Sequence, residues 1–367
     1  MRRQLIFAVA LIAAAGMSGC GLVKQLYDTQ TESGTQVISE EGSEKTPETV
    51  SEEIPFVLST EDEEEFIVPA GEAVLQTEDE TEPYFIVPDT EMTEEEEEVQ
   101  TETDNGPLNT VLNDIVYART AIGEHWSIGY EDLETGEIYG YQDGDVMQSA
   151  SVVKLFIMGA VYRYMCYPSD GEDPIDFYEE YDGHLRDTIS SMITVSDNDA
   201  ANLLIERLGG GDFRKGAELI GQFCQENGYT GTSIGRRFLD PAPAGDNYTT
   251  AADTRKFLSD LYHGRLVNEE ASAKMLQFVK DQTRRNKIPA GLPEGFACGN
   301  KTGEMPEGYN LGCIENDAAI VFAPEGMGEG YVLTVLSNDL GGRNAEAIQA
   351  IVQISSQTAA WYAEQHS

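Results

Sequence analysis

Two side chains three positions apart, Ser151 and Lys154, are the first candidates for chemistry in this sequence. They stand at the start of an apolar run over 152–166 that predicts a helix, and positions i and i+3 share one helix face, so the amine can approach the hydroxyl. A hydroxyl needs a base within hydrogen-bond reach, and a lysine serves only if its pKa falls to about 7–8. The free backbone N–H groups of a helix N-terminus are suited to stabilise an oxyanion. Taken alone, the pattern is equally typical of a helix cap beside a solvated charge.

Two more polar motifs follow along the chain. Ser196-Asp197-Asn198 stands 45 residues after Ser151, with Asn202 a helical turn later, and Lys301-Thr302-Gly303 closes a predicted strand. By itself, the first of these motifs indicates a polar turn between helices, because Ser, Asp and Asn favour turns. The second alone is an ordinary strand exit.

The three motifs together, in this order, resemble the Ser-x-x-Lys, Ser-Asp-Asn and Lys-Thr-Gly constellation of class A β-lactamases and penicillin-binding proteins. The flanking residues 149–157 (SASVVKLFI) and 196–204 (SDNDAANLL) are similar to that family beyond the bare motifs. The resemblance covers about 107–367 and implies a serine hydrolase with a β-lactamase/transpeptidase-like fold.

The resemblance also implies roles for the matching residues. Ser151 would be the acylated nucleophile, Lys154 its general-base partner, and Ser196 the group that passes a proton to the leaving β-lactam nitrogen. Asp197 would orient the loop and take no part in the reaction.

The implied substrate-binding residues are Asn198, Lys301, Thr302, Gly303 and Glu304. Asn198 would hold the substrate amide, and Lys301 with Thr302 would bind the substrate carboxylate. The backbone N–H groups of Ser151 and Glu304 would form the oxyanion hole.

The match breaks at the loop that hydrolyses the acyl-enzyme. A class A β-lactamase needs a Glu there, followed closely by an Asn, and no Glu-x-x-x-Asn occurs in 236–250 (RRFLDPAPAGDNYTT). Asp240-Pro241 is the nearest stand-in, one methylene shorter and without the following Asn. An ordinary turn residue is the favoured interpretation of Asp240. We therefore expect intact acylation and leave fast deacylation open.

Three functions fit these observations. The first is a β-lactamase-type hydrolase that opens β-lactams through an acyl-Ser151 intermediate. The second is a penicillin-binding-like D,D-peptidase that acts on cell-wall peptide or traps penicillin, which the missing Glu favours. The third is a tethered binding module without catalysis, which the intact Ser151, Lys154, Ser196, Lys301 and Thr302 argue against.

The elements that must position these residues alternate between helix and strand patterns. Helices are expected at 107–122, 152–166, 185–208, 213–227, 250–262 and 344–366. Strands are expected at 126–133, 137–142, 296–302, 318–322 and 331–337. No strand–helix–strand repeat supports a parallel sheet, so we predict a mixed α/β (α+β) domain with one antiparallel sheet of about five strands and helices on both faces.

The first twenty residues indicate where the protein is located. Arg2 and Arg3, an apolar run over 5–15 and Met17-Ser18-Gly19-Cys20 have the layout of an export signal. The final Cys resembles a bacterial lipobox, so Cys20 is expected to carry lipid at the extracytoplasmic face of the cell membrane. A plain signal peptide with a chance cysteine is the alternative.

Residues 21–105 hold 27 acidic and 2 basic side chains, which predicts a disordered tether ahead of a folded domain at 106–367. The net charge of −43 argues against nucleic-acid binding, because no basic surplus exists to displace counterions from phosphates. We expect a monomer whose partners are a β-lactam or cell-wall peptide and the membrane.

The remaining cysteines and the histidines carry weaker signals. Cys166, Cys224, Cys298 and Cys313 permit three complete disulfide pairings. Cys298–Cys313 is the most plausible pair because both flank the Lys-Thr-Gly turn, and buried free thiols are the alternative. The scattered histidines have no metal-binding spacing, so no metal or cofactor is expected; they are His125, His184, His263 and His366.

Overall fold

A computed structural model describes residues 105–168, 184–240, 245–306 and 313–367. The predicted export signal at 1–20 with Cys20, and the predicted tether apart from Asn105, lie outside these residues and stay predictions. In the described part of the chain, every helix is too short or too polar to cross a membrane.

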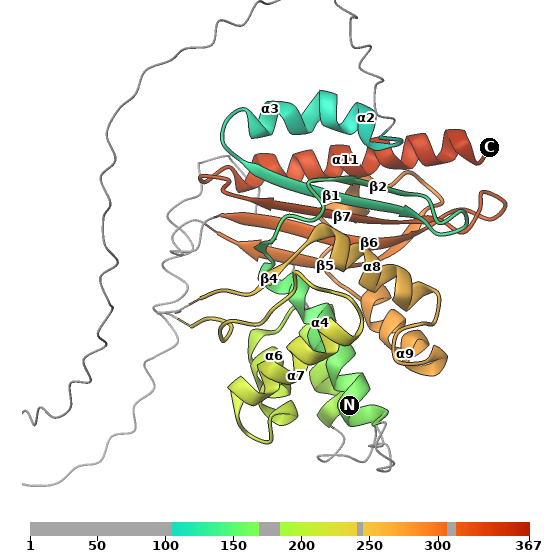
Figure 1. Cartoon of the computed structure of the whole chain (residues 1–367). Helices are drawn as coiled ribbons and strands as arrows, with labels where there is room; N and C mark the ends of the chain where they lie inside the picture. Colours follow the sequence, from blue (N-terminus) through green and yellow to red (C-terminus); the bar gives the residue numbers. More distant parts are fainter. Residues whose placement is uncertain (1–104, 169–183, 241–244, 307–312) are drawn as a thin grey trace, which may run out of the picture. The chain divides into compact units, whose positions relative to one another are not determined.

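One five-stranded antiparallel sheet forms the centre of the domain (Figure 1). Its strand order is β2-β1-β7-β6-β5. The strands are β1 (His125–Asp132), β2 (Ile138–Tyr141), β5 (Ala297–Met305), β6 (Ile314–Phe322) and β7 (Tyr331–Asn338). This sheet confirms the predicted one. The strand that carries the Lys-Thr-Gly motif, β5, lies at its edge.

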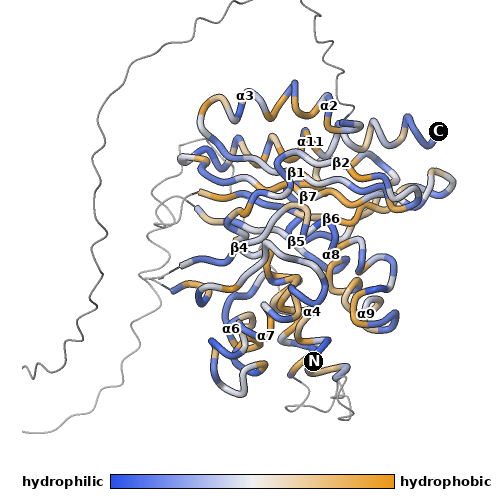
Figure 2. Tube along the Cα trace, viewed as in Figure 1, coloured by the Kyte–Doolittle hydropathy of each residue, from blue (hydrophilic) through white to orange (hydrophobic). Residues whose placement is uncertain are grey.

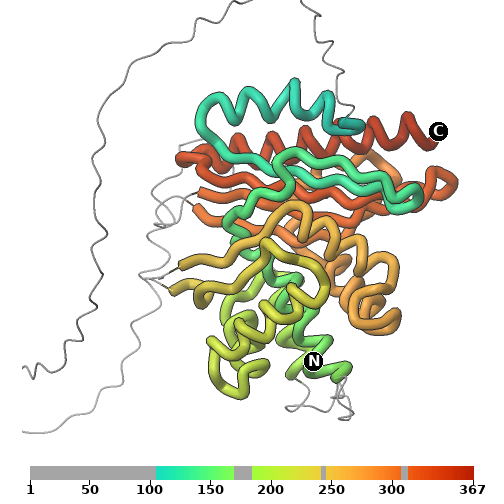
Figure 3. The backbone as a smooth tube through the Cα atoms, in the orientation of Figure 1, coloured from blue at the N-terminus to red at the C-terminus, as the bar shows by residue number. Residues whose placement is uncertain are grey.

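Helices cover both faces of the sheet, as predicted (Figure 1). One face carries α2 (Leu108–Val111), the π-helical η1 (Leu112–Val116), α3 (Tyr117–Thr120), α10 (Ile288–Gly291) and α11 (Asn344–Gln365). On the opposite side lie η2 (Ala150–Val153), α4 (Lys154–Val161), η3 (Tyr162–Cys166), α5 (His184–Thr194), α6 (Asn198–Leu208), α7 (Phe213–Glu226), α8 (Ala251–Tyr262) and α9 (Glu269–Lys280). The first and last helices of the described domain lie side by side, and Gln357 of α11 donates a 3.1 Å hydrogen bond to Asp114 (Figure 3).

The sheet separates two hydrophobic cores, which appear as orange segments in Figure 2. The first core surrounds α4, all eight residues of which are buried. A helix that is buried on every side needs an apolar surface all round, and only Lys154 departs from it. The second core packs Leu108 of α2 and Ile351 of α11 against the other face of the sheet. Lys154, the predicted general base, therefore comes from a helix that is buried on every side.

The helical region expected over 185–208 is two helices. α5 ends at Thr194 and α6 begins at Asn198, and between them Ser196 has a φ of +64°. Asp197 caps α6 by accepting a 2.7 Å hydrogen bond from the Ala200 N–H. The break occurs because an aspartate at an N-cap starts a new helix, and it turns the Ser196 backbone toward the interior.

Four further elements were not predicted from the sequence. α9 and α10 follow α8. The two-residue strands β3 (Met147–Gln148) and β4 (Tyr248–Thr249) pair with each other in an antiparallel arrangement. This short pair matters for the site, because it ties the segment before Ser151 to the end of the loop at 236–247.

Of the two alternatives for the cysteines, the structure has the buried thiols and not the Cys298–Cys313 disulfide. The four cysteines at 166, 224, 298 and 313 are buried thiols that form no disulfide within the described residues. Cys298 is opposite Val321 in the register of β5 and β6, whereas Cys313 precedes Ile314, the partner of Met305 at the other end of that hairpin. Seven residues of extended strand separate the two positions by roughly 23 Å, far beyond the reach of a disulfide.

Candidate active site

A cavity of about 270 Å³ opens beside β5, η2 and the start of α6. Four of the predicted residues line it: Ser151, Asn198, Asp240 and Glu304. The other lining residues are Ala150, Arg236, Phe238, Leu239, Asp246, Asn247, Arg284, Met305 and Pro306. Lys154, Ser196, Lys301 and Thr302 are buried, and Lys154 is hydrogen-bonded to Asn198 of the lining. The three sequence motifs therefore meet at one place.

Two buried amines converge on the Ser196 hydroxyl. Lys301 Nζ donates to Ser196 Oγ over 2.9 Å, and Lys154 Nζ lies 3.5 Å from the same oxygen. Lys154 also donates to the Ser196 carbonyl and to Asn198 Oδ1, both at 2.7 Å. A proton can pass along this chain of contacts without a change in the backbone.

Burial sets the protonation of both amines. Desolvation, with Lys301 close by, lowers the pKa of Lys154 to about 6. Desolvation likewise lowers the pKa of Lys301 to about 7, against the opposing pull of Glu304. At neutral pH, Lys154 is therefore mostly a free base, which is the state that a general base requires.

Ser151 is partly exposed in the first turn of η2, and it faces the cavity. Among the described residues, no hydrogen bond joins its hydroxyl to Lys154, which donates to Ser196 and Asn198 instead. Such contacts are commonly loose before substrate binds. The preceding residue, Ala150, has a φ of +44°, and backbone strain of this kind clusters at functional sites.

The Lys-Thr-Gly motif lies inside β5, which continues to Met305 beyond the predicted end at Thr302. A Cβ on Gly303 would stand 2.8 Å from the Ser149 carbonyl oxygen and 3.1 Å from the Ser151 nitrogen. Glycine therefore allows β5 to approach the backbone of the candidate nucleophile. This approach brings the Glu304 backbone and the Ser151 N–H to the same cavity.

Thr302 adds a further polar group. Its side chain is buried, and Oγ1 forms no hydrogen bond of ordinary geometry with the described residues, although it lies close enough to Glu304 to help lower the pKa of that carboxyl. An unpaired buried hydroxyl costs free energy, so a polar group of a ligand is the natural partner for it.

The loop with Asp240 places an aromatic ring over the candidate base. The Phe238 ring lies 4.7 Å from Lys154 Nζ, and the Asn202 carboxamide holds the Phe238 backbone through hydrogen bonds of 3.0 and 3.2 Å. Leu239 follows with a φ of +61°, and Asp240 lines the cavity. The proposed role of Asp240 stays a prediction.

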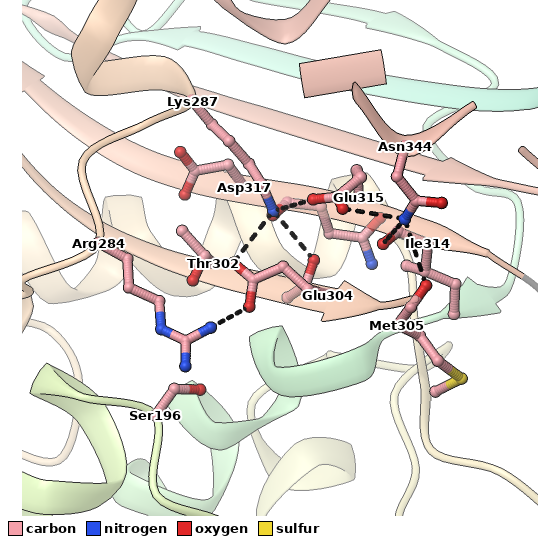
Figure 4. Close-up of polar contacts among 12 residues, drawn as sticks. Ser196, Arg284, Lys287, Thr302, Glu304, Met305, Ile314, Glu315, Asp317 and Asn344 are labelled. Carbon is pink, nitrogen blue, oxygen red and sulfur yellow. Dashed lines mark hydrogen bonds and ion pairs between the residues drawn. The ribbon is translucent and has the colours of Figure 1, made fainter. Parts of the chain in front are cut away.

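Sequence reasoning missed two cations at the other side of the cavity. Arg284 and Lys287 precede α10 and both form ion pairs with Glu304 (Figure 4). Nothing in the run Arg284-Arg285-Asn286-Lys287 predicts that its last residue is fully buried. The acidic residue directly after Lys-Thr-Gly was the one visible signal of a cationic partner.

The comparisons with known proteins agree with this geometry. The sequence profile described as "Beta-lactamase enzyme family" matches residues 107–166 and 176–362. The chain is 25% identical over 226 residues to Beta-lactamase 3 of Bacillus cereus, covering 56% of this chain and 67% of that protein. It is 25% identical over 218 residues to a β-lactamase of Streptomyces cellulosae, covering 53% and 67%.

Solved structures share the fold. A β-lactamase from Sphaerobacter thermophilus superposes with a TM-score of 0.55 at 23% identity, covering 72% of this chain and 98% of that one. PBP-A gives a TM-score of 0.56 at 21% identity, covering 70% and 97%. The chain thus belongs to the β-lactamase enzyme family, and its folded domain is that of the class A β-lactamase-like serine hydrolases.

Proposed function

We propose that this protein is a serine hydrolase that opens β-lactams through an acyl-Ser151 intermediate. One observation carries the proposal: the amines of Lys154 and Lys301 meet at the Ser196 hydroxyl beside the cavity that Ser151 lines. An activated hydroxyl, a neutral base and a route for the returning proton are what acyl transfer needs.

Acylation begins with proton transfer from Ser151 Oγ to neutral Lys154 Nζ. The Oγ lone pair attacks the carbonyl carbon, and the electron pair of the C=O moves to oxygen. The N–H groups of Ser151 and Glu304 stabilise that oxyanion; losing one such donor typically costs about 10²–10³ in rate. When the C–N bond breaks, Ser196 gives its proton to the leaving nitrogen and regains one from Lys154. The products are an acyl-Ser151 ester and a neutral base.

A second candidate function is a lasting acyl trap of the penicillin-binding kind. Phe238 favours it, because an aromatic ring lies over Lys154 in the loop where a hydrolytic water would have to be activated. In this alternative, the ester forms as described and water reaches it slowly. Asp240 is the lining carboxylate that would activate the water in the hydrolase.

The setting that we propose is the extracytoplasmic face of a bacterial cell membrane. The layout of residues 1–20 supports export and lipid attachment at Cys20, and the acidic composition of 21–105 supports a tether for a monomeric domain. Replacing Cys20 with serine should move the protein from the membrane fraction to the soluble one. Retention of the variant in the membrane fraction would contradict the lipid anchor.

An intact-mass time course with a penicillin tests the catalytic proposal. A penicilloyl adduct that forms and then disappears, while hydrolysed drug accumulates, is the expected result. A persistent adduct would instead identify the acyl trap. Ser151→Ala should abolish the adduct in either case, and labelling that survives this substitution would overturn the assignment of the nucleophile. No adduct in the unmodified protein would leave a binding module without catalysis.

A further inference from the structure

The cations beside β5 are already paired with carboxylates of the chain. Lys287 is fully buried, and its Nζ lies 3.2 Å from Glu304 Oε1 and 2.7 Å from Glu315 Oε2. The same ammonium donates to the carbonyls of Gly303 and Asn316 at 3.2 and 3.0 Å. Lys287 is therefore held between β5 and β6, where two carboxylates compensate its positive charge (Figure 4).

Glu304 also binds the exposed cation of the group. Arg284 Nη1 forms an ion pair with Glu304 Oε2, and its side chain is 46% exposed against 24% for Glu304. Both residues line the cavity with Ser151. One carboxylate thus joins a buried and an accessible cation at the wall of the site, and Figure 4 shows Glu304 reaching toward both.

The charges of this group cancel. Burial alone would raise the pKa of Glu304, but Lys287 and Arg284 outweigh it and hold that pKa below its usual range, so the carboxylate is ionised at neutral pH. Two cations, Arg284 and Lys287, face two carboxylates, Glu304 and Glu315. These four side chains together therefore carry no net charge. The further amine beside Thr302 is Lys301, and its lowered pKa of about 7 leaves it only partly charged at neutral pH.

The neutral groups nearby remain available. Thr302 Oγ1 is buried two residues from Glu304 on the same strand, forms no hydrogen bond of ordinary geometry with the described residues, and lies close enough to Glu304 to help lower the pKa of that carboxyl. A hydroxyl can donate to the carbonyl of an ester or amide as well as to a carboxylate. The wall of the cavity is thus suited to an uncharged oxygen acceptor.

We propose that Glu304 is a specificity-determining residue whose carboxylate occupies the cations beside Thr302, so that the site favours acyl substrates that are neutral there over those with a free carboxylate. This inference rests on the proposed function for the location of the substrate. The favoured class is an amide or ester whose leaving-group side continues as a neutral chain.

Binding of benzylpenicillin and its methyl ester to the full chain tests this inference. Both are titrated calorimetrically against Ser151→Ala, which cannot be acylated, with and without Glu304→Gln. With Glu304 present, the ester should bind at least as tightly as the acid. Glu304→Gln should tighten binding of the acid about tenfold, because a like charge near the ligand is removed, and should change ester binding less than twofold.

Glu137→Gln is the charge-matched control. Glu137 is exposed in the turn before β2, at the opposite end of the sheet by the strand register, so its loss should change neither affinity. Acid and ester that respond equally to Glu304→Gln, or an acid that already binds tenfold better than the ester with Glu304 present, would overturn the inference. So would undetectable binding of both compounds to every variant.

A second variant, Arg284→Ala, tests the inference independently if Glu304→Gln does not fold. Arg284→Ala removes an exposed side chain and leaves Glu304 less compensated, so the acid should bind more weakly while ester binding is kept; unchanged acid binding would contradict the inference. Covalent labelling of the unmodified protein judges the proposed function separately. A protein that shows the acid–ester shift without labelling would refute the hydrolase and retain the specificity role of Glu304.

Discussion

At the scale of single residues, Lys154 and Lys301 approach the same hydroxyl but differ in the pH at which each loses its proton. Both approach Ser196 Oγ, yet burial lowers the pKa of Lys154 to about 6 and that of Lys301 to about 7. Between these values, the first amine is mostly neutral and the second is mostly charged. A base and an ammonium can then act on the same hydroxyl at the same pH.

The rate of acylation should therefore depend on pH as a narrow bell. It should rise as Lys154 loses its proton through about 6 and fall as Lys301 loses its proton above about 7. Stopped-flow measurement of acylation by a penicillin from pH 5 to 9 checks this profile. Lys301→Arg keeps a charge that does not titrate in this range, so its alkaline limb should vanish. A flat profile in the unmodified protein would contradict the assignment of Lys154 as the base.

At the scale of elements, β5 places most of the site. Lys301 reaches Ser196, Gly303 lies against the backbone of Ser151, and Glu304 meets Arg284 and Lys287 on the other side. One edge strand thus contacts the turn that carries Ser151, the Ser-Asp-Asn motif and the two cations Arg284 and Lys287.

Gly303→Ala should slow acylation by about 10²-fold or more. The new Cβ would meet the Ser149 carbonyl at 2.8 Å and the Ser151 nitrogen at 3.1 Å, so the oxyanion donors must move apart. Gly221→Ala is the matched control, because a Cβ in α7 meets nothing within 4 Å. It should leave acylation unchanged and stabilise the fold by about 0.5–1 kcal/mol. Rates from the mass time course decide, and equal rates for both variants would refute the close approach.

The sequence predicted which helices and strands form better than it predicted where they begin and end. Alternation and the three motifs were sufficient for the sheet, its two helical layers and the meeting of the three motifs at one place. The predicted approach of Lys154 to the Ser151 hydroxyl is not among the hydrogen bonds of the described residues, where Lys154 donates to Ser196 and Asn198 instead. The extent of β5 was missed because Gly303-Glu304 resembles a strand exit, whereas pairing with β6 continues to Met305. The burial of Lys287 depends on partners contributed by β5 and β6, and no local pattern encodes such contacts.

At the scale of the whole molecule, the sheet separates the site from half of the core. The first core packs under α4 and carries Lys154, while the second joins α2 and α11 to the opposite face. Stability can therefore be lowered from one side while the geometry of the site on the other side is kept.

Leu108→Ala tests this separation. Leu108 is fully buried in the second core, so truncation should cost about 2–5 kcal/mol of unfolding free energy in urea titrations. Acylation per folded molecule should stay within twofold. Ile122→Ala, at a side chain that is 55% exposed, should cost less than about 0.5 kcal/mol. A loss of acylation in folded Leu108→Ala would show that the two cores are coupled.

The edge position of β5 also governs how this chain can diversify. Side chains on a strand alternate between faces, so one residue inserted after Cys298 would turn Lys301 away from Ser196 and present Asn300 in its place. Two inserted residues would restore the face but shift every group by about 6.6 Å along the strand. Substitutions in β5 can change which substrates are accepted, whereas changes in its length would dismantle the site. Insertions and deletions can therefore be tolerated in the surface loops but not in β5.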